Sequence, residues 1–482
     1  MFPNKYKHDI YHIFSLSHHV VLTYKLSGML SSVVNKYNVA GPRYTSYPTV
    51  PYWDKETFSL LEWKQSVMKS YRESNRAEGI SLYIHLPFCE SLCTFCGCTK
   101  RITKRHKVET PYINALLKEW NLYLDLFRER PVIKELHLGG GTPTFFSPEN
   151  MQRLVDGIFR HAKKAEHFEF SFEGHPNNTT KEHLQALYEV GFRRVSYGVQ
   201  DYNETVQKAI RRIQSFEAVE KATEMAREIG YTSVGHDIIF GLPFQTDDHI
   251  RQTILNTQIL KPDRLAFYSY AHTPWIKGNG QRGFNDADLP SAEAKRLQYQ
   301  LGKKLLETIG YSEIGMDHFA LKSDSLYQSM QSGNLHRNFM GYTASKTQVM
   351  VGLGVSAISD SWYGFSQNVK SVELYYNLLK DNMLPVMRGH ILTKEDLIIR
   401  KHILNLMCQF QTTWNDENQY FPNLPEVLIQ LKEMEADGLV QLDSKRLVIT
   451  EKGRPFVRNV CMAFDLLLQR KQPETKLFSM TV

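Results

Sequence analysis

Short apolar runs alternate with longer helix-like segments from about Gly79 to Ser359, and this alternation restricts the possible fold more than any other feature. Strands separated by a helix must pair in parallel, because the chain crosses back over the sheet between them. The pattern therefore predicts a doubly wound sheet or an α/β barrel. Six strands are predicted, at residues 80–88, 134–140, 168–174, 193–200, 233–243 and 264–272.

Residues suited to binding follow each predicted strand. In chain order they are a cysteine-rich loop, Gly139 to Pro143, Glu173, Gln200, Asp237, and Tyr270 to His272. An α/β barrel places its site at the carboxyl ends of its strands, where all these residues would meet. We therefore expect an α/β fold built on an incomplete parallel (β/α)6 barrel with one mouth.

Other segments flank this predicted barrel. Tyr37 to Trp53 is rich in Tyr, Pro and Gly, which is typical of an extended arm. After Ser359 the chain is expected to be mainly helical, and its last part has the helix, hairpin, helix order of a winged helix. Its recognition helix is not notably basic, so a structural or lid role is favoured over DNA binding. The expected divisions are an extension (1–36), an arm (37–78), the barrel (79–360) and a helical domain (361–482).

The composition narrows the class of protein. None of the 482 residues belongs to a run approaching the ~18 apolar residues of a membrane span, and no signal peptide is recognised. Six cysteines are too few for a disulfide scaffold, so we expect a reducing, cytoplasmic location. The net charge of +7 suits an anionic partner, but a solvated surface of mixed charge is the better explanation of this number alone.

Four of the cysteines lie in the stretch CESLCTFCGC, from Cys89 to Cys98. Thiolates on such a short loop are typical ligands of an iron–sulfur cluster. A structural zinc site normally takes two separated pairs of ligands, and no second pair is present here. A thioredoxin-like redox motif would leave the additional cysteines unexplained. The loop therefore predicts a cluster.

The spacing Cys-x3-Cys-x2-Cys, followed by the Gly-Gly-Gly-Thr-Pro loop, resembles the radical S-adenosylmethionine (SAM) superfamily. Further motifs resemble one family within it, the oxygen-independent coproporphyrinogen III oxidases. They are GPRYTSYPT, YIHLPFCESLCTFCGC, LHLGGGTPT, GVQDYNETVQ, DIIFGLPFQT, YSYAHTP, IGMDHFA, LHRNFMGYT, GLGVSAIS and RNVCMAFD. Ten motifs in the family's order cover nearly the whole chain from Tyr37 to about Gln469.

The resemblance implies a reaction in haem biosynthesis. Two propionates of coproporphyrinogen III would become vinyls, giving protoporphyrinogen IX, after a SAM-derived 5'-deoxyadenosyl radical abstracts hydrogen. The implied cofactors are a 4Fe-4S cluster and two molecules of SAM. An unidentified electron donor and acceptor would take part, no nucleic acid is involved, and we expect a monomer. Because the radical belongs to SAM, no catalytic side chain is assigned.

The resemblance also implies binding residues. Cys89, Cys93 and Cys96 would hold three irons of the cluster and leave the fourth open to SAM. Cys98 would then be a neighbour of the cofactor pocket. The positions that match the first SAM are Tyr83, Gly140, Glu173 and Ile358. Those that match the second are Gly141, Thr142, Gln200, Arg212, Asp237 and Ala271.

Some residues fall outside the family pattern or carry other expectations. Met340 stands where relatives can have Gln, so a polar contact to the second SAM would be lost. Residues 1–28 have no counterpart, which suggests that translation begins at Met29. Candidate partners for the substrate's propionates are Arg43, Arg337 and Arg388. The alternatives are a radical SAM-like haem chaperone, which typically lacks the fourth cysteine and the arm, and a radical SAM enzyme acting on tRNA, which would need an RNA-binding domain.

Overall fold

The computed structural model describes residues 28–275, 280–281, 283–471 and 477–481 of the protein. Residues 1–27, on which the expectation of a translation start at Met29 depends, lie outside the described part of the chain. Among the described helices, none combines the length and the apolar character needed to span a bilayer.

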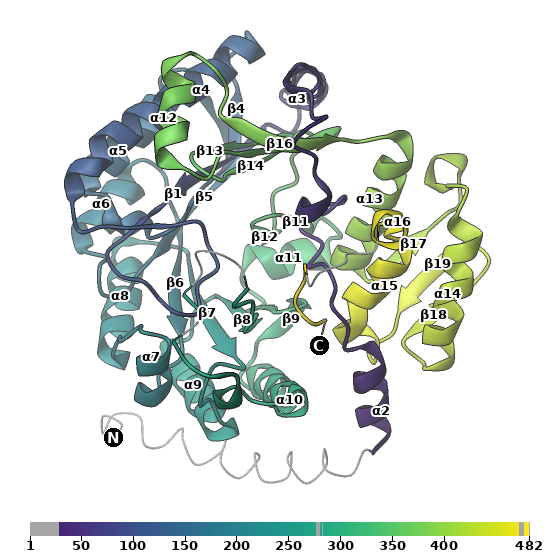
Figure 1. Ribbon diagram of the computed structural model, residues 1–482. Coiled ribbons are helices and arrows are strands. Elements are labelled where there is room, and N and C mark those ends of the chain that lie inside the picture. Colours follow the sequence, from purple (N-terminus) through teal and green to yellow (C-terminus); the bar gives the residue numbers. More distant parts are fainter. Residues whose placement is uncertain (1–27, 276–279, 282, 472–476, 482) are drawn as a thin grey trace.

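The six predicted strands pair in parallel and in chain order, which confirms the incomplete (β/α)6 barrel. Helices form an arc around the outside of these strands (Figure 1). The strands are β1 (Ile80–Leu86), β4 (Val132–Gly140), β5 (Lys163–Gly174), β6 (Arg194–Gln200), β7 (Ser233–Phe240) and β8 (Arg264–Ser269). The helices are α4 (Glu109–Phe127), α5 (Pro148–Phe159), α6 (Lys181–Glu189), α7 (Glu204–Ala209), α8 (Phe216–Ile229), α9 (Asp247–Leu260) and α10 (Ala292–Thr308).

Local sequence explains where these elements begin. Side-chain oxygens of Ser147, Thr180, Asn203, Ser215, Thr246 and Ser291 cap the first turns of α5 to α10. β1 is buried at every position, as expected for a parallel strand covered on both faces. Capped helices and apolar strands thus alternate, and the carboxyl ends of the strands all lie at the same mouth of the barrel.

The sheet is larger than the sequence indicates, with 12 strands. β13 (Met350–Leu353) adds a further parallel strand beside β1. The expected domain boundary at residue 360 falls inside this sheet, since β15 and β16 follow it and pair onto β14 and β15. The additional elements are β9 (Ser312–Gly315), β10 (His318–Ala320), α11 (Ser325–Gln331), β14 (Ile358–Asp360), β15 (Gly364–Asn368), α12 (Val372–Lys380) and β16 (Val386–Ile391).

A smaller domain follows, with its own apolar core around Leu431 and Phe464. The predicted helix, hairpin, helix order is present, and β17 adds a third strand to the hairpin. Its elements are α13 (Lys394–Gln409), β17 (Gln411–Thr413), α14 (Leu424–Ala436), β18 (Val440–Leu442), β19 (Arg446–Ile449), α15 (Val457–Phe464) and α16 (Leu466–Arg470).

The arm joins the two parts, and Figure 1 shows it in purple between the sheet and the yellow C-terminal domain. It leaves α2 (Gly28–Tyr37) and leads to α3 (Leu60–Ser74). Tyr44 and Tyr47 are buried in the core of the C-terminal domain. On the other side, the ring of Trp53 stacks on Phe365 of β15 with 5.2 Å between centroids. The arm therefore fixes the C-terminal domain beside the barrel.

Candidate cofactor site

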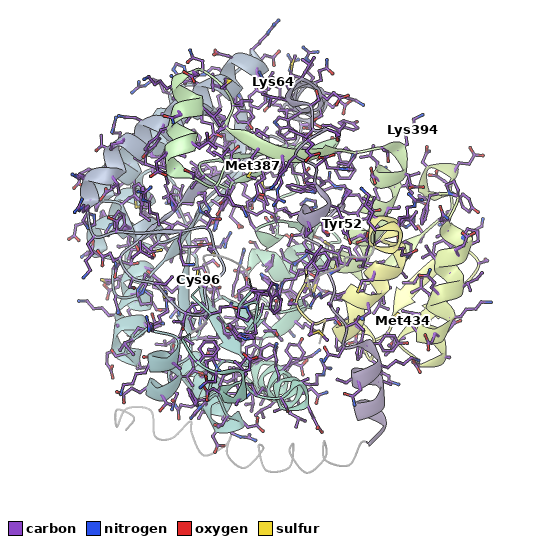
Figure 2. The ribbon with its side chains drawn as sticks, viewed as in Figure 1. Tyr52, Lys64, Cys96, Met387, Lys394 and Met434 are labelled. Carbon is purple, nitrogen blue, oxygen red and sulfur yellow. The ribbon has the colours of Figure 1, made fainter. Side chains whose placement is uncertain are left out.

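The three candidate cluster ligands lie on one loop that leaves β1 and returns beside it. β2 (Phe88–Cys89) pairs with β3 (Arg101–Ile102), so the two ends of the loop are held together. Thr94 fixes the middle, because its N–H donates to Ile210 O at 3.0 Å and its hydroxyl to Ala209 O at 2.9 Å. Cys96 is well separated in Figure 2 from Met434 of the C-terminal domain.

Donor and cationic groups surround the thiols. Thr142 Oγ1 donates to Cys89 Sγ at 3.4 Å, and the Arg212 guanidinium to Cys93 Sγ at 3.8 Å. Burial raises the pKa of Cys89 to about 11, which the Thr142 hydrogen bond partly opposes. A hydrogen bond from Cys98, assisted by the Lys100 ammonium, lowers the pKa of Cys96. The hydrogen bonds and the cations favour the ligating, thiolate form of sulfur, whereas burial opposes it at Cys89.

This donor set fits a cluster better than a single metal ion. Cys93 and Cys96 are close enough to Cys89 to affect its charge. Within the described residues, no three His, Cys, Asp or Glu side chains converge on one ion position. A 4Fe-4S cluster does not require convergence, because each thiolate ligates a different iron. Cys98 is exposed, and it lies near enough to Glu173 and Tyr83 for their charges to interact.

The glycines after β4 lie directly against the start of this loop. Gly140 has a φ of +115°, and a Cβ there would lie 2.7 Å from the His85 ring. A Cβ on Gly141 would lie 2.7 Å from the carbonyl carbon of Pro87. Side chains are thus excluded, and bare backbone faces the site, as close approach to a ligand requires.

Three of the four residues assigned to the first SAM lie together. The N–H of Gly140 donates to Glu173 Oε2 at 3.1 Å, and Tyr83 and Glu173 both lie against the preceding Gly139. Burial alone would raise the pKa of Glu173, but hydrogen bonds from His137 and Gly140 lower it below its usual value. The ionised carboxylate can accept from hydroxyl or ammonium groups. Ile358 lies on β14, two strands away from β1.

The residues assigned to the second SAM also surround the loop. Thr142 contacts Cys89, and Gln200 and Arg212 both lie against Gly198. Sequence reasoning missed Gln281, whose amide donates to Ala271 O and to Phe95 O, both at 3.0 Å. It thereby ties the end of β8 to the cysteine loop. No motif distinguishes this glutamine, because the contact joins positions far apart in the chain.

A cavity of ≈ 100 Å³ opens inside the barrel beside these residues. Glu173, Asp237 and Tyr268 line it, and Met340 stands among them. A thioether is only a weak acceptor, so the expected loss of a polar contact at this position stays a prediction. Arg337 and Tyr342 come from a hairpin of β11 (His336–Asn338) and β12 (Gly341–Thr343) beside the cavity.

Asp237 makes the stability of the protein depend on pH. Burial, followed by the charge of Glu173, raises its pKa to about 7, against about 4 in an unfolded chain. The folded state therefore keeps a proton that the unfolded state has lost, and stability falls as the pH rises from about 4 to about 7. Above pH 7 the full loss of stability caused by the buried Asp237 carboxylate is present.

We therefore expect Asp237→Asn to raise the melting temperature at pH 8 and to change it little at pH 5. Asp317→Asn is the matched control, since the Arg43 guanidinium holds the pKa of Asp317 below its usual range. That variant should lose stability at both pH values. Thermal unfolding of the metal-free chain measures the melting temperatures of both variants. An Asp237→Asn effect that is equal at pH 5 and pH 8 contradicts a raised pKa of Asp237.

An incomplete parallel (β/α)6 barrel with three cysteines on its first loop and a glycine turn on its second defines a radical SAM protein. The model of the Radical SAM superfamily matches residues 83–255, and that of the HemN C-terminal domain matches residues 392–456. The chain is 39% identical to the oxygen-independent coproporphyrinogen III oxidase of Salmonella typhimurium over 445 residues, which are 91% of this chain and 96% of the relative. With the Escherichia coli enzyme the identity is 38%, with the same coverage.

The solved structure of coproporphyrinogen III oxidase (HemN) from Escherichia coli, described as a radical SAM enzyme, superposes with a TM-score of 0.83. The identity is 37%, and the match covers 88% of this chain and 98% of that one. The chain therefore belongs to the family of oxygen-independent coproporphyrinogen III oxidases.

Proposed function

We propose that this protein converts two propionates of coproporphyrinogen III to vinyls in haem biosynthesis, giving protoporphyrinogen IX without molecular oxygen. The observation that supports this most is the loop of three cysteines against the Gly140 turn, in a chain similar to these oxidases along almost its whole length. When bound, the 4Fe-4S cluster supplies the electron that cleaves SAM to the hydrogen-abstracting radical. The free thiols that hold it favour a reducing, cytoplasmic compartment.

The chain's own residues bind and orient the reactants. Cys89, Cys93 and Cys96 hold the cluster. The Gly140 backbone and the ionised Glu173 receive one SAM, with Glu173 accepting from hydroxyl or ammonium groups. Arg212 holds a second SAM through its buried Nε, which has no partner among the described residues.

Arg43 and Arg337 are the residues best placed to bind the substrate's carboxylates. Arg337 is 4% exposed, and its Nε and Nη1 lack partners among the described residues. Its guanidinium lies 4.5 Å from the ring of Tyr342, and that of Arg43 lies 5.8 Å from the ring of Tyr268. Both tyrosines line the barrel cavity. Leaving the buried nitrogens of Arg337 unpaired is costly, so a bound anion would offset the cost. Arg43 already forms an ion pair with Asp317, and its contact to the substrate would be additional.

Replacing Arg337 by alanine should raise the KM for coproporphyrinogen III by about tenfold or more, with a smaller effect on kcat, because a charge-assisted hydrogen bond is lost. Arg337→Lys should restore part of the affinity. Arg388→Ala is the control, since Gln367 Oε1 already accepts from its Nε and Nη2 at 2.8 and 2.6 Å. Steady-state kinetics with dithionite as reductant provides the measurement, and an equal KM in all variants refutes the role of Arg337.

The function is tested by anaerobic reconstitution with iron and sulfide, followed by incubation with coproporphyrinogen III, SAM and dithionite. Protoporphyrinogen IX, two CO2 per product and 5'-deoxyadenosine are expected. Tight haem binding without turnover would instead indicate a haem chaperone. Modification of tRNA without porphyrin turnover would indicate an RNA-directed enzyme.

A further inference from the structure

A basic surface segment follows the cysteine loop and has no role in the proposed chemistry. It consists of residues 100–107, KRITKRHK, in which five side chains are Lys or Arg. Glu373 forms an ion pair with Arg101, and Glu109 accepts a hydrogen bond from His106 at 2.7 Å. The other exposed cations form no ion pair or side-chain hydrogen bond with any described residue, and we call them the basic rim: Lys104, Arg105 and Lys107.

The segment is joined to the loop that holds the thiols. Ile102 lies opposite Cys89 in the β2–β3 ladder, and Thr103 N–H donates to Cys89 O at 2.9 Å. Lys100 Nζ donates to Cys96 O at 3.0 Å. The basic rim therefore begins one residue after direct backbone contacts to a ligand cysteine.

The basic segment and the cysteine loop each expose one apolar side chain. Ile102 is 43% exposed and Leu92, inside the cysteine loop, is 37% exposed. A Cβ built on Gly97 meets no atom within 4 Å, so the cysteine loop is open to solvent at this residue. Small apolar contacts beside charged groups are typical of brief, electrostatically steered complexes. Ile102 and Thr103 contact the backbone of Cys89 directly, so the segment lies next to the loop that carries the three thiols.

We propose that the basic rim, with Leu92 and Ile102, is the docking surface for an acidic one-electron carrier protein. This inference rests on the proposed function, which requires a reduced cluster for each cleavage of SAM. In the complex the carrier is oxidised by one electron and the cluster is reduced by one electron, and no bond or proton is exchanged. Docking here places the donor against the segment whose backbone pairs with Cys89.

A nucleic acid is the other polyanion that a basic surface could bind. Residues 100–107 contain no Phe, Tyr or Trp on which bases could stack, and the segment is short. The apolar side chains beside the cations and the contact to the thiol loop favour a protein donor. Binding of RNA is therefore treated as an outcome that contradicts the proposal.

The test compares the wild-type enzyme with the rim variant Lys104→Glu/Arg105→Glu/Lys107→Glu. The control variant, Lys394→Glu/Lys432→Glu/Lys445→Glu, changes the net charge equally at exposed positions of the C-terminal domain. Lys394 lies far from Cys96 in Figure 2. An acidic flavodoxin serves as the probe, and dithionite serves as a small reductant that needs no docking surface.

We expect the rim variant to bind flavodoxin about tenfold or more weakly than wild type at low salt, because rim charges steer and hold the encounter. The control variant should bind like wild type, and high salt should weaken wild-type binding toward that of the rim variant. Calorimetry gives the affinities, and electron paramagnetic resonance gives the rate of cluster reduction by reduced flavodoxin. With dithionite, all three proteins should reach the same extent of reduction.

Equal flavodoxin affinity and reduction rate in wild type and rim variant overturn the proposal. It is also overturned if wild type does not bind flavodoxin, if the control variant loses affinity equally, or if the surface retains RNA in preference to flavodoxin. These measurements need no porphyrin. If flavodoxin binds through the rim but no porphyrin is turned over, only the proposed substrate is contradicted. If porphyrin is turned over but flavodoxin does not bind, only the proposed docking surface is contradicted.

Discussion

Cys89→Ala, Cys93→Ala and Cys96→Ala are each expected to abolish the iron–sulfur cluster and all turnover, whereas Cys98→Ala keeps the iron content. Three thiolates leave one iron of the cluster without a protein ligand, and SAM needs that position. The three residues share one loop whose ends are held by the β2–β3 pairing. Loss of one ligand leaves a cluster held by only two thiolates, which would not survive purification.

Iron, sulfide and visible absorbance after anaerobic reconstitution measure this effect. Cys98→Ala is the matched control because it removes a thiol two residues from Cys96 on the same loop. Its hydrogen bond with Cys96 is lost, so a change in reduction potential without loss of iron is compatible with the assignment. Loss of iron in Cys98→Ala together with retention in Cys96→Ala would reverse the roles of these two residues.

The second large effect is expected from Gly141→Ala. The added methyl would lie 2.7 and 2.8 Å from the carbonyl carbon and oxygen of Pro87, so the backbone that leads into Cys89 must move. Overpacking of this kind costs about 1–3 kcal/mol in stability. Displacement of the SAM cradle should lower kcat/KM by about a hundredfold, since a shift of about 1 Å at a reacting centre has that effect.

Gly97→Ala is the matched control on the adjoining loop. A Cβ there meets no atom within 4 Å, and its φ is not in the left-handed region. It should leave stability, SAM affinity and turnover near wild type. Equilibrium binding of SAM to the reconstituted enzyme, with turnover, separates the two variants. If Gly141→Ala binds SAM and turns over like Gly97→Ala, the close approach of the two loops has no functional importance.

Much of the fold follows from local patterns. The apolar runs at 80–88 and 233–243 predict strands, and the Ser and Thr residues before the helices act as caps. β15 and β16 were not foreseen, because Gly364–Asn368 has no alternating apolar pattern. This segment becomes a strand by pairing with β14 and β16, and the sheet consequently extends beyond residue 360.

The sequence alone determined the incomplete parallel (β/α)6 barrel, the three cysteines at the first strand end and the glycine turn at the second. These depend on periodicity and on short spacings, which act within a few residues of the chain. Only the tertiary structure decided which groups meet across the mouth. Gln281 reaches the cysteine loop, Arg337 lies buried with unpaired nitrogens, and the basic rim borders the thiols. Such contacts join residues far apart in sequence, so packing of the whole chain determines them.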